Sequence, residues 1–165
     1  MSDLVIMIDL DGTLKTEHDL HGPYEVDSIH VTSGSKKYIF GARPHIHDFL
    51  SEAKKKANLY LGTAGGGGYA RRVLKAMEIG DYFTEIIAAE NFRDGLPCFG
   101  TFRNAIYIDN DEKIAKQKID RIQHSMYFRN RIPYPGRQDM WVIDTYTGEK
   151  DDKTMLDLAE EMRQI

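Results

Sequence analysis

The sequence contains little cysteine, no long apolar run and no excess of positive charge. Cys98 is the only cysteine among the 165 residues, so no internal disulfide can form, which favours a reducing compartment. The longest apolar run, Leu4–Ile8, is too short to span a membrane, and no signal-peptide cleavage pattern follows it. The formal net charge is −4, whereas a protein that coats nucleic acid with its whole surface would be basic. We therefore expect a soluble, cytoplasmic protein with no membrane contact.

The length and the pattern of apolar residues predict one α/β domain spanning residues 1–165. Apolar runs typical of buried strands lie at residues 4–8, 59–61, 86–89, 105–108 and 140–143. Patterns typical of helices lie at residues 44–53, 69–79, 114–122 and 154–162, the last with Leu156, Leu158 and Ala159 on its apolar face. This alternation predicts a Rossmann-like fold, in which helices flank a mostly parallel central sheet.

A small insertion interrupts this alternation at about residues 15–42. Residues 25–31 and 37–41 have the pattern of two strands, and Thr32-Ser33-Gly34-Ser35 between them is typical of a hairpin turn. We expect a β-hairpin flap here. The flap and one helix use up the chain between the first two predicted strands, so no large cap domain is expected. Residues 91–104 and 127–139 carry glycine and proline and are expected to be irregular.

Two carboxylates directly follow the first predicted strand, in the segment Asp9-Leu10-Asp11-Gly12-Thr13-Leu14. In an open α/β sheet, ligands bind beyond the carboxyl ends of the strands. Asp9 and Asp11 are two residues apart at such an edge and can both reach one site, and Gly12 allows a sharp turn. The alternative is an ordinary capped turn, since Asp and Gly are common where strands end.

Two further strand ends carry polar groups. Thr63-Ala64-Gly65 and the glycines that follow open a helix, where a hydroxyl and backbone N–H groups can cradle a phosphate, although many glycine-rich loops bind nothing. Asp109-Asn110-Asp111 follows the fourth predicted strand, and its acidic and amide oxygens suit Mg²⁺. All three segments are predicted to meet at one edge of the sheet.

Together these segments resemble motifs I, II and IV of the haloacid dehalogenase-like (HAD) phosphatases. The segment Arg43-Pro44-His45 after the hairpin is similar to that of the carboxy-terminal-domain phosphatases, the NLI-interacting-factor-like branch of this superfamily. Residues 61–64, 106–110 and 152–158 continue the similarity. The resemblance therefore implies a HAD fold and a phosphoric monoester hydrolase.

The resemblance also implies a role for each site residue. Asp9 would be the nucleophile that forms an aspartyl-phosphate, and Asp11 the general acid and base. Asp9, the carbonyl of Asp11, Asp109 and Asn110 would hold Mg²⁺. Thr63 would hold phosphate oxygens, and further substrate contacts are expected from Thr13, Ala64 and Gly65.

Two departures from the family pattern concern charge. Motif I reads Asp-Gly-Thr where this branch usually has Asp-Glu-Thr, and no lysine lies between Lys75 and Lys113, so the motif III lysine is missing. Arg93 or Arg103 would have to supply its positive charge, and Arg93 is expected to do so because it closely follows the third predicted strand.

The expected substrate is a phosphomonoester, phosphoserine or phosphothreonine in proteins being the first candidate, because a site without a cap is open to a macromolecule. An alternative is a phosphatase of nucleic-acid ends or nucleotides, which the basic and aromatic stretch from Lys113 to Arg137 favours, although such a stretch is also typical of a solvated surface. A non-catalytic HAD-fold binding module is a third possibility, favoured by the missing lysine.

Overall fold

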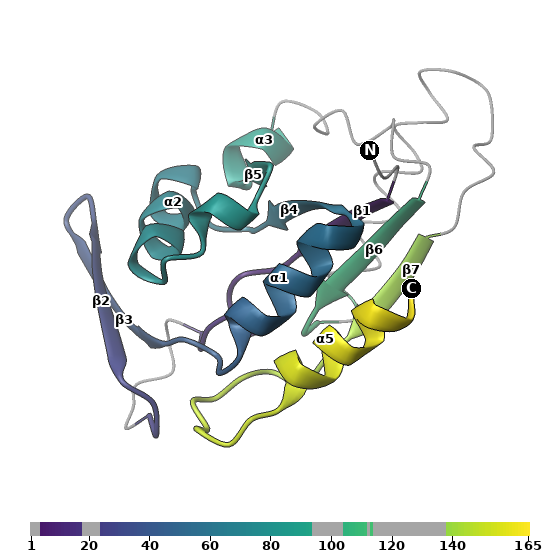
Figure 1. The fold of residues 1–165 in the computed structure, drawn as a ribbon. Coiled ribbons are helices and arrows are strands. Elements are labelled where there is room, and N and C mark those ends of the chain that lie inside the picture. The colour runs from purple at the N-terminus through teal and green to yellow at the C-terminus, as the bar shows by residue number, and fades with distance from the viewer. Residues whose placement is uncertain (1–3, 18–23, 94–103, 112, 114–137) are drawn as a thin grey trace.

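The central element is a sheet of five parallel strands in the order β5-β4-β1-β6-β7, shown in the computed structural model (Figure 1). The structure describes residues 4–17, 24–93, 104–111, 113 and 138–165. The strands are β1 (Leu4–Ile8), β4 (Asn58–Gly62), β5 (Glu85–Ile87), β6 (Asn104–Asp109) and β7 (Gln138–Val142). The predicted α/β fold with a parallel sheet is confirmed.

β1, β4 and β6 contain the apolar runs that predicted them, because strands buried on both faces read as continuous apolar sequence, whereas β7 ends at Val142, one residue before the end of its predicted run. Val5, Ile6, Met7 and Ile8 of β1 are all at most 3% exposed. The fifth, β5, ends earlier than the predicted strand at 86–89. The Asn91 side chain accepts a hydrogen bond from the Ala88 N–H (2.9 Å), and α3 (Ala89–Arg93) begins one residue later. The expectation of irregular structure was therefore wrong for residues 91–93. It was also wrong for 104, the first residue of β6, and for 138 and 139, which belong to β7.

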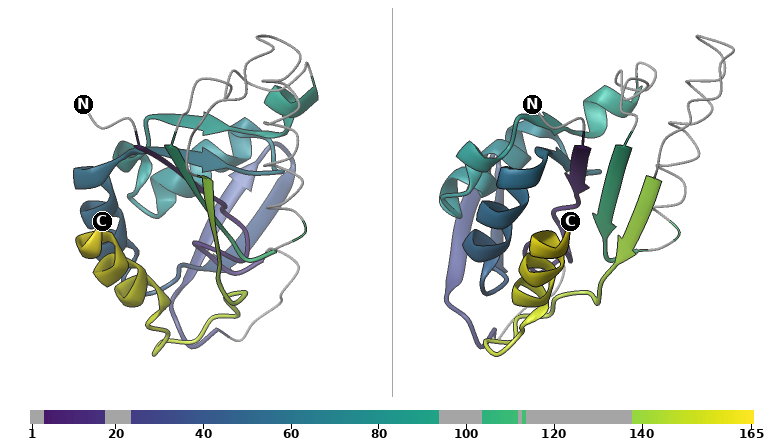
Figure 2. Two further views of the ribbon diagram at one scale, coloured as in Figure 1. Left: turned by 90° about the vertical axis from the view of Figure 1, so that its right-hand side faces the viewer. Right: turned by 45° about the vertical axis from the view of Figure 1, so that its right-hand side comes forward.

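In the described part of the chain, three longer helices accompany the sheet, namely α1 (Ile46–Lys56), α2 (Gly67–Ala76) and α5 (Thr154–Gln164). Figure 2 shows α1 and α5 side by side on one face of the sheet. The predicted apolar face of α1 is buried. In α5 the buried residues are Met155, Leu158, Ala159 and Met162, whereas Leu156 is 37% exposed, because it lies one position off that stripe. The predicted helix at 114–122 lies outside the described residues.

The hairpin forms a separate two-stranded antiparallel sheet of β2 (Ser28–Ser33) and β3 (Lys36–Gly41). Ser33 pairs with Lys36, so the turn is shorter than expected, and Gly34 takes the left-handed φ of 62° that a tight turn requires. The first strand begins at Ser28 rather than Glu25. The hairpin packs on α2, where Arg72 Nη1 donates to the Thr32 carbonyl (3.1 Å).

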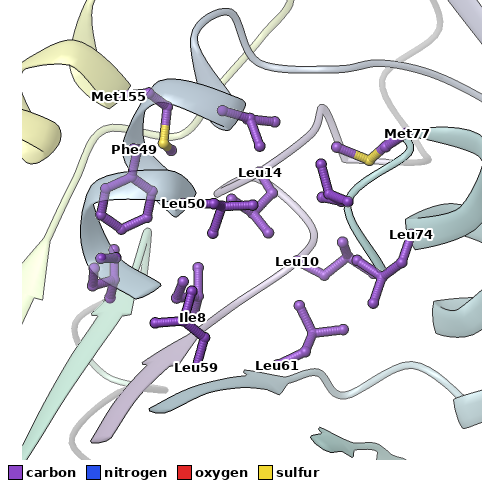
Figure 3. Close-up of a cluster of buried hydrophobic side chains, with 14 of the residues drawn as sticks. Ile8, Leu10, Leu14, Phe49, Leu50, Leu59, Leu61, Leu74, Met77 and Met155 are labelled. Carbon is purple, nitrogen blue, oxygen red and sulfur yellow. The ribbon is translucent and has the colours of Figure 1, made fainter. Parts of the chain in front are cut away.

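The hydrophobic core joins the sheet to the helices and reaches into the loop after β1. Figure 3 shows Leu10 and Leu14 within the cluster that also contains Ile8, Leu50 and Leu61. Both loop leucines are fully buried. This anchorage holds the polar residues that alternate with them at the sheet edge. Among the described residues, no helix is both long and apolar enough to cross a membrane.

Candidate functional site at the carboxyl edge of the sheet

The loop after β1 turns sharply at Gly12 and presents Asp9 and Asp11 at the sheet edge. The Asp9 N–H donates to the Ile108 carbonyl (2.9 Å), and the Leu14 N–H returns to the Leu10 carbonyl (3.0 Å). Gly12 has φ 82°, a conformation that L side chains rarely adopt. A Cβ at this position would also lie 2.5 Å from Nδ2 of Asn110. Glycine is therefore required both for the turn and for the close approach of the Asn110 side chain.

The Thr13 hydroxyl connects the carboxyl ends of β1 and β6. It lies 3.4 Å from Oδ2 of Asp9 and 3.2 Å from Oδ1 of Asn110, and Thr13 itself is fully buried. Asn110 is oriented from its other end, because Nδ2 donates to Thr145 Oγ1 (3.0 Å). The buried Asp109 accepts a hydrogen bond from the Asp111 N–H through Oδ1 (2.9 Å). The structure thus brings Asp9, Thr13 and Asn110 together.

The donor set beside Asp9 fits a magnesium ion. A carboxylate oxygen and an amide oxygen lie within 3.4 Å of one hydroxyl. Within the described ranges, no three His, Cys, Asp or Glu side chains gather into a cluster that would enclose an ion. Mg²⁺ is commonly bound by one or two carboxylates and several waters, so a small, open set of hard oxygen donors is appropriate.

The glycine-rich loop after β4 leads into α2, and its Gly65 lies against the Tyr69 ring of that helix. Thr63 is buried, and its Oγ1 accepts the Gly65 N–H (3.0 Å). A Cβ at Gly65 would lie 3.1 Å from the Tyr69 ring. At the start of α2, the Gly67 N–H donates to Oε1 of Glu90 (2.8 Å). Two amides of the expected phosphate cradle therefore have acceptors within the protein, while Ala64 is exposed.

Asp11 has two donors that the pattern of the sequence did not reveal. The Tyr69 hydroxyl donates to Oδ1 of Asp11 (3.0 Å), and the ammonium of Lys15 forms an ion pair with the same oxygen. Burial, followed by the charge of Asp11, raises the pKa of Tyr69 far above its usual range, so the hydroxyl remains a donor. Burial lowers the pKa of Lys15, and the attraction of Asp11 opposes this effect.

The segment after β7 supports the loop from its other side. Arg43 is 2% exposed, and its Nη1 donates to the Thr13 carbonyl (3.0 Å). Its Nη2 reaches the Asp144 carbonyl (2.9 Å) and a carboxylate oxygen of Asp152 (3.0 Å). The Tyr146 N–H donates to the Gly12 carbonyl (2.8 Å). No chemical motif marks Asp144 or Tyr146 in the sequence, whereas Arg43 and Asp152 lie in segments that carry the family resemblance.

Arg93 is the last residue of α3, and its side chain lies outside the described part of the structure. Arg103 is not among the described residues. The stretch from Lys113 to Arg137 is described only at Lys113. The replacement of the motif III lysine by Arg93 therefore stays a prediction.

Comparison with known proteins supports the architecture. The sequence profile of a family described as NLI interacting factor-like phosphatase matches residues 4–131. Fission yeast RNA polymerase II CTD phosphatase Fcp1 bound to beryllium fluoride has a similar fold, with a TM-score of 0.55 and 15% identity over 97% of this chain and 50% of that chain. A second structure of Fcp1, an essential RNA polymerase II CTD phosphatase, gives a TM-score of 0.57 and 15% identity over 96% of this chain and 61% of that chain. No curated protein sequence matches this chain.

The chain thus spans about half to three fifths of the Fcp1 chains that it matches. At this level of identity, the two structures establish the fold. The expected HAD fold and the expected branch of the superfamily are confirmed by the profile and the fold together.

Proposed function

The chain belongs to the NLI interacting factor-like phosphatase family of the HAD superfamily, and we propose that it hydrolyses phosphomonoesters through an aspartyl-phosphate on Asp9. The observation that carries the proposal is the Thr13 hydroxyl between the carboxylate of Asp9 and the amide of Asn110. This contact supports the proposal, because the Asp9 carboxylate, our proposed nucleophile, lies close to a second oxygen donor at the carboxyl edge of the sheet. Asp11, two residues further along, is held by its own donors.

In the first step, a carboxylate oxygen of Asp9 attacks phosphorus while the bond between phosphorus and the leaving oxygen breaks. Asp11 gives its proton to that oxygen. In the second step, Asp11 accepts a proton from a water molecule that attacks phosphorus, and the bond between phosphorus and Asp9 breaks. Inorganic phosphate leaves, and both carboxyl groups return to their initial states.

Asp9, Asp11 through its carbonyl, Asp109 and Asn110 would hold Mg²⁺, which when bound screens the negative charges of nucleophile and phosphate. Thr63 accepts a hydrogen bond from Gly65 and can donate its own proton to a phosphate oxygen. Thr13, Ala64 and Gly65 complete the proposed substrate contacts, and the Gly65 N–H would exchange its bond to Thr63 Oγ1 for one to a phosphate oxygen. Arg93 adds a positive charge in this proposal.

The proposed substrate is a phosphoserine or phosphothreonine side chain in a protein. The supporting observations are the fold shared with RNA polymerase II CTD phosphatases and the small size of the flap. The second candidate, removal of phosphate from nucleic-acid ends or nucleotides, is favoured by the basic and aromatic stretch from Lys113 to Arg137. A non-catalytic role is disfavoured by the two retained carboxylates, since a scaffold has no use for a pair of like charges. In either catalytic case we propose a cytoplasmic enzyme.

The nucleophile and the metal can be tested together. Wild-type protein and Asp9→Asn are assayed with p-nitrophenyl phosphate, phosphopeptides and 5′-phosphorylated oligonucleotides, with Mg²⁺, Ca²⁺ or EDTA. We expect Mg²⁺-dependent turnover by the wild type only, because an amide cannot attack phosphorus and the larger Ca²⁺ tolerates looser geometry. Turnover by folded Asp9→Asn would refute the nucleophile, and equal rates in EDTA would refute the metal.

A further inference from the structure

Lys15 is a charged residue that is fully buried, so it belongs neither to the apolar core nor to the solvated surface. Its side chain has 0% exposure, although lysine is almost never buried unless it is paired. It lies four residues after Asp11, at the base of the flap, where its backbone pairs with Ala42. The ammonium forms its ion pair with Oδ1 of Asp11 and donates to the Thr16 carbonyl (2.7 Å).

Aromatic rings enclose this ammonium. Nζ lies 4.9 Å from the centre of the Phe40 ring on the flap and 5.9 Å from that of Tyr69 on α2. Such rings attract a cation through their negative faces and also exclude water. Removing water strengthens the attraction between the ammonium and the carboxylate. The ion pair between Lys15 and Asp11 is therefore strong, and Phe40 of the flap covers it.

Both donors converge on the same oxygen of Asp11. The ammonium of Lys15 forms its ion pair with Oδ1, and the hydroxyl of Tyr69 donates a hydrogen bond to the same oxygen (3.0 Å). An oxygen that accepts two such hydrogen bonds is not the one that carries the acid proton of a carboxyl group. In the proposed reaction the proton therefore has to be carried by Oδ2.

We infer that Lys15 is a positioning residue, which holds Oδ1 of Asp11 and so presents Oδ2 to the leaving group. The inference rests on the proposed function. It also provides a buried positive charge beside the two aspartates in a chain that lacks the motif III lysine. Lys15 acts through Asp11 and does not touch the substrate.

The test compares kcat/KM for phenyl phosphate, which has a poor leaving group, with that for p-nitrophenyl phosphate, which has a good one. The variant Lys15→Met keeps the length of the side chain and removes its charge. If Lys15 positions the acid, kcat/KM for phenyl phosphate should fall by about tenfold to hundredfold, and that for p-nitrophenyl phosphate by less than about threefold, because a good leaving group needs little protonation. Lys15→Arg should recover part of the loss.

The control Lys36→Met removes an exposed lysine from β3 of the flap and should leave both rates unchanged. A folded Lys15→Met protein that loses both activities in equal proportion would overturn the inference. A Tyr69→Phe variant should also lose more kcat/KM for phenyl phosphate than for p-nitrophenyl phosphate, but to a smaller extent than Lys15→Met, because it removes the second donor to Oδ1.

A second comparison remains decisive if Lys15→Met does not fold alone. In an Asp11→Asn background, adding Lys15→Met should cause no further loss of kcat/KM for p-nitrophenyl phosphate, because the group that Lys15 positions is already absent. A further loss of tenfold would overturn the inference. Asp9→Asn separates the two proposals, because phosphatase activity retained by this variant would refute the proposed function. An equal loss of kcat/KM for the two substrates in Lys15→Met would refute only the role of Lys15.

Discussion

Replacing Arg43 by alanine is expected to destabilise the protein and loosen the loop that carries Asp9. Arg43 is 2% exposed. Its guanidinium donates to both oxygens of Asp152 (3.2 and 3.0 Å) and to the Thr13 carbonyl (3.0 Å). Nη2 also reaches the carbonyl of Asp144 (2.9 Å). The substitution removes all these donors and leaves their acceptors behind.

The size of the effect follows from the Asp152 carboxylate, which is only 13% exposed and loses its partner. Removing one member of a buried ion pair costs about 3–5 kcal/mol, which is a large part of the roughly 5–15 kcal/mol of a typical domain. Arg163 is a matched control, because it is 51% exposed and pairs with Glu160 on the surface. Arg163→Ala should cost less than about 1 kcal/mol.

The loss should depend on pH with a defined sign. Burial acts to raise the pKa of Asp152, but the hydrogen bonds from Arg43 and Thr154 hold this pKa below its usual value. A carboxyl with a lower pKa in the folded state than in the unfolded chain stabilises the fold above the unfolded value, near pH 4, and this contribution is lost as the pH falls through the folded value. The stability difference between wild type and Arg43→Ala should therefore narrow below about pH 4.

Urea unfolding followed by circular dichroism measures these differences, at pH 7 and over a series down to pH 3. Arg43→Lys retains the charge but not the planar fork, so it should recover only a minor part of the stability. A loss below about 1 kcal/mol for Arg43→Ala at pH 7 would refute the reasoning, since it is the value expected of a surface pair. So would a difference that widens on acidification.

Three further predictions test the remaining parts of the site. Gly12→Ala should cost about 1–3 kcal/mol in urea unfolding and impair turnover, because alanine is strained at this φ and its Cβ would collide with Asn110. Arg93→Ala should lower turnover by about tenfold to a thousandfold, and Arg103→Ala should have a mild effect; the reverse result would show that the wrong arginine was chosen. If the stretch from Lys113 to Arg137 binds single-stranded nucleic acid, affinity should fall with salt by a slope of about −0.7 per phosphate neutralised, and absence of binding at low salt would contradict it.

The strands were predictable because a parallel sheet is buried on both faces, so β1, β4 and β6 are continuous apolar runs. The residues at which the strands end were less predictable, because individual polar contacts determine them and the apolar pattern does not show these contacts. β5 ends at Ile87 since Asn91 caps the Ala88 N–H. The hairpin turn is shorter than expected because Ser33 and Lys36 still pair. Leu156 was misplaced for a different reason, because the closely spaced apolar residues at 155, 156, 158 and 159 do not reveal where the centre of the helical stripe lies.

The convergence of Asp9, Thr13 and Asn110 was also predictable, because polar residues at the carboxyl ends of neighbouring parallel strands must meet at one edge. The supports of the loop were not. Tyr146 contributes its backbone N–H to Gly12, and any residue except proline could do so. Tyr69 reads as part of the apolar face of a helix, and its ring does pack there, but its hydroxyl reaches Asp11.

The burial of Lys15 could not be predicted from the local sequence. An aspartate followed by a lysine four residues later is typical of a solvated helical pair, which contributes little to stability or function. Here the loop is not a helix, and β3 returns to place Phe40 over the ammonium. Burial of this charge thus depends on a hairpin that begins thirteen residues later (28 − 15) and on a tyrosine from α2. The insertion after β1 therefore contributes to the surroundings of Asp11, because its Phe40 covers the lysine that pairs with this carboxylate.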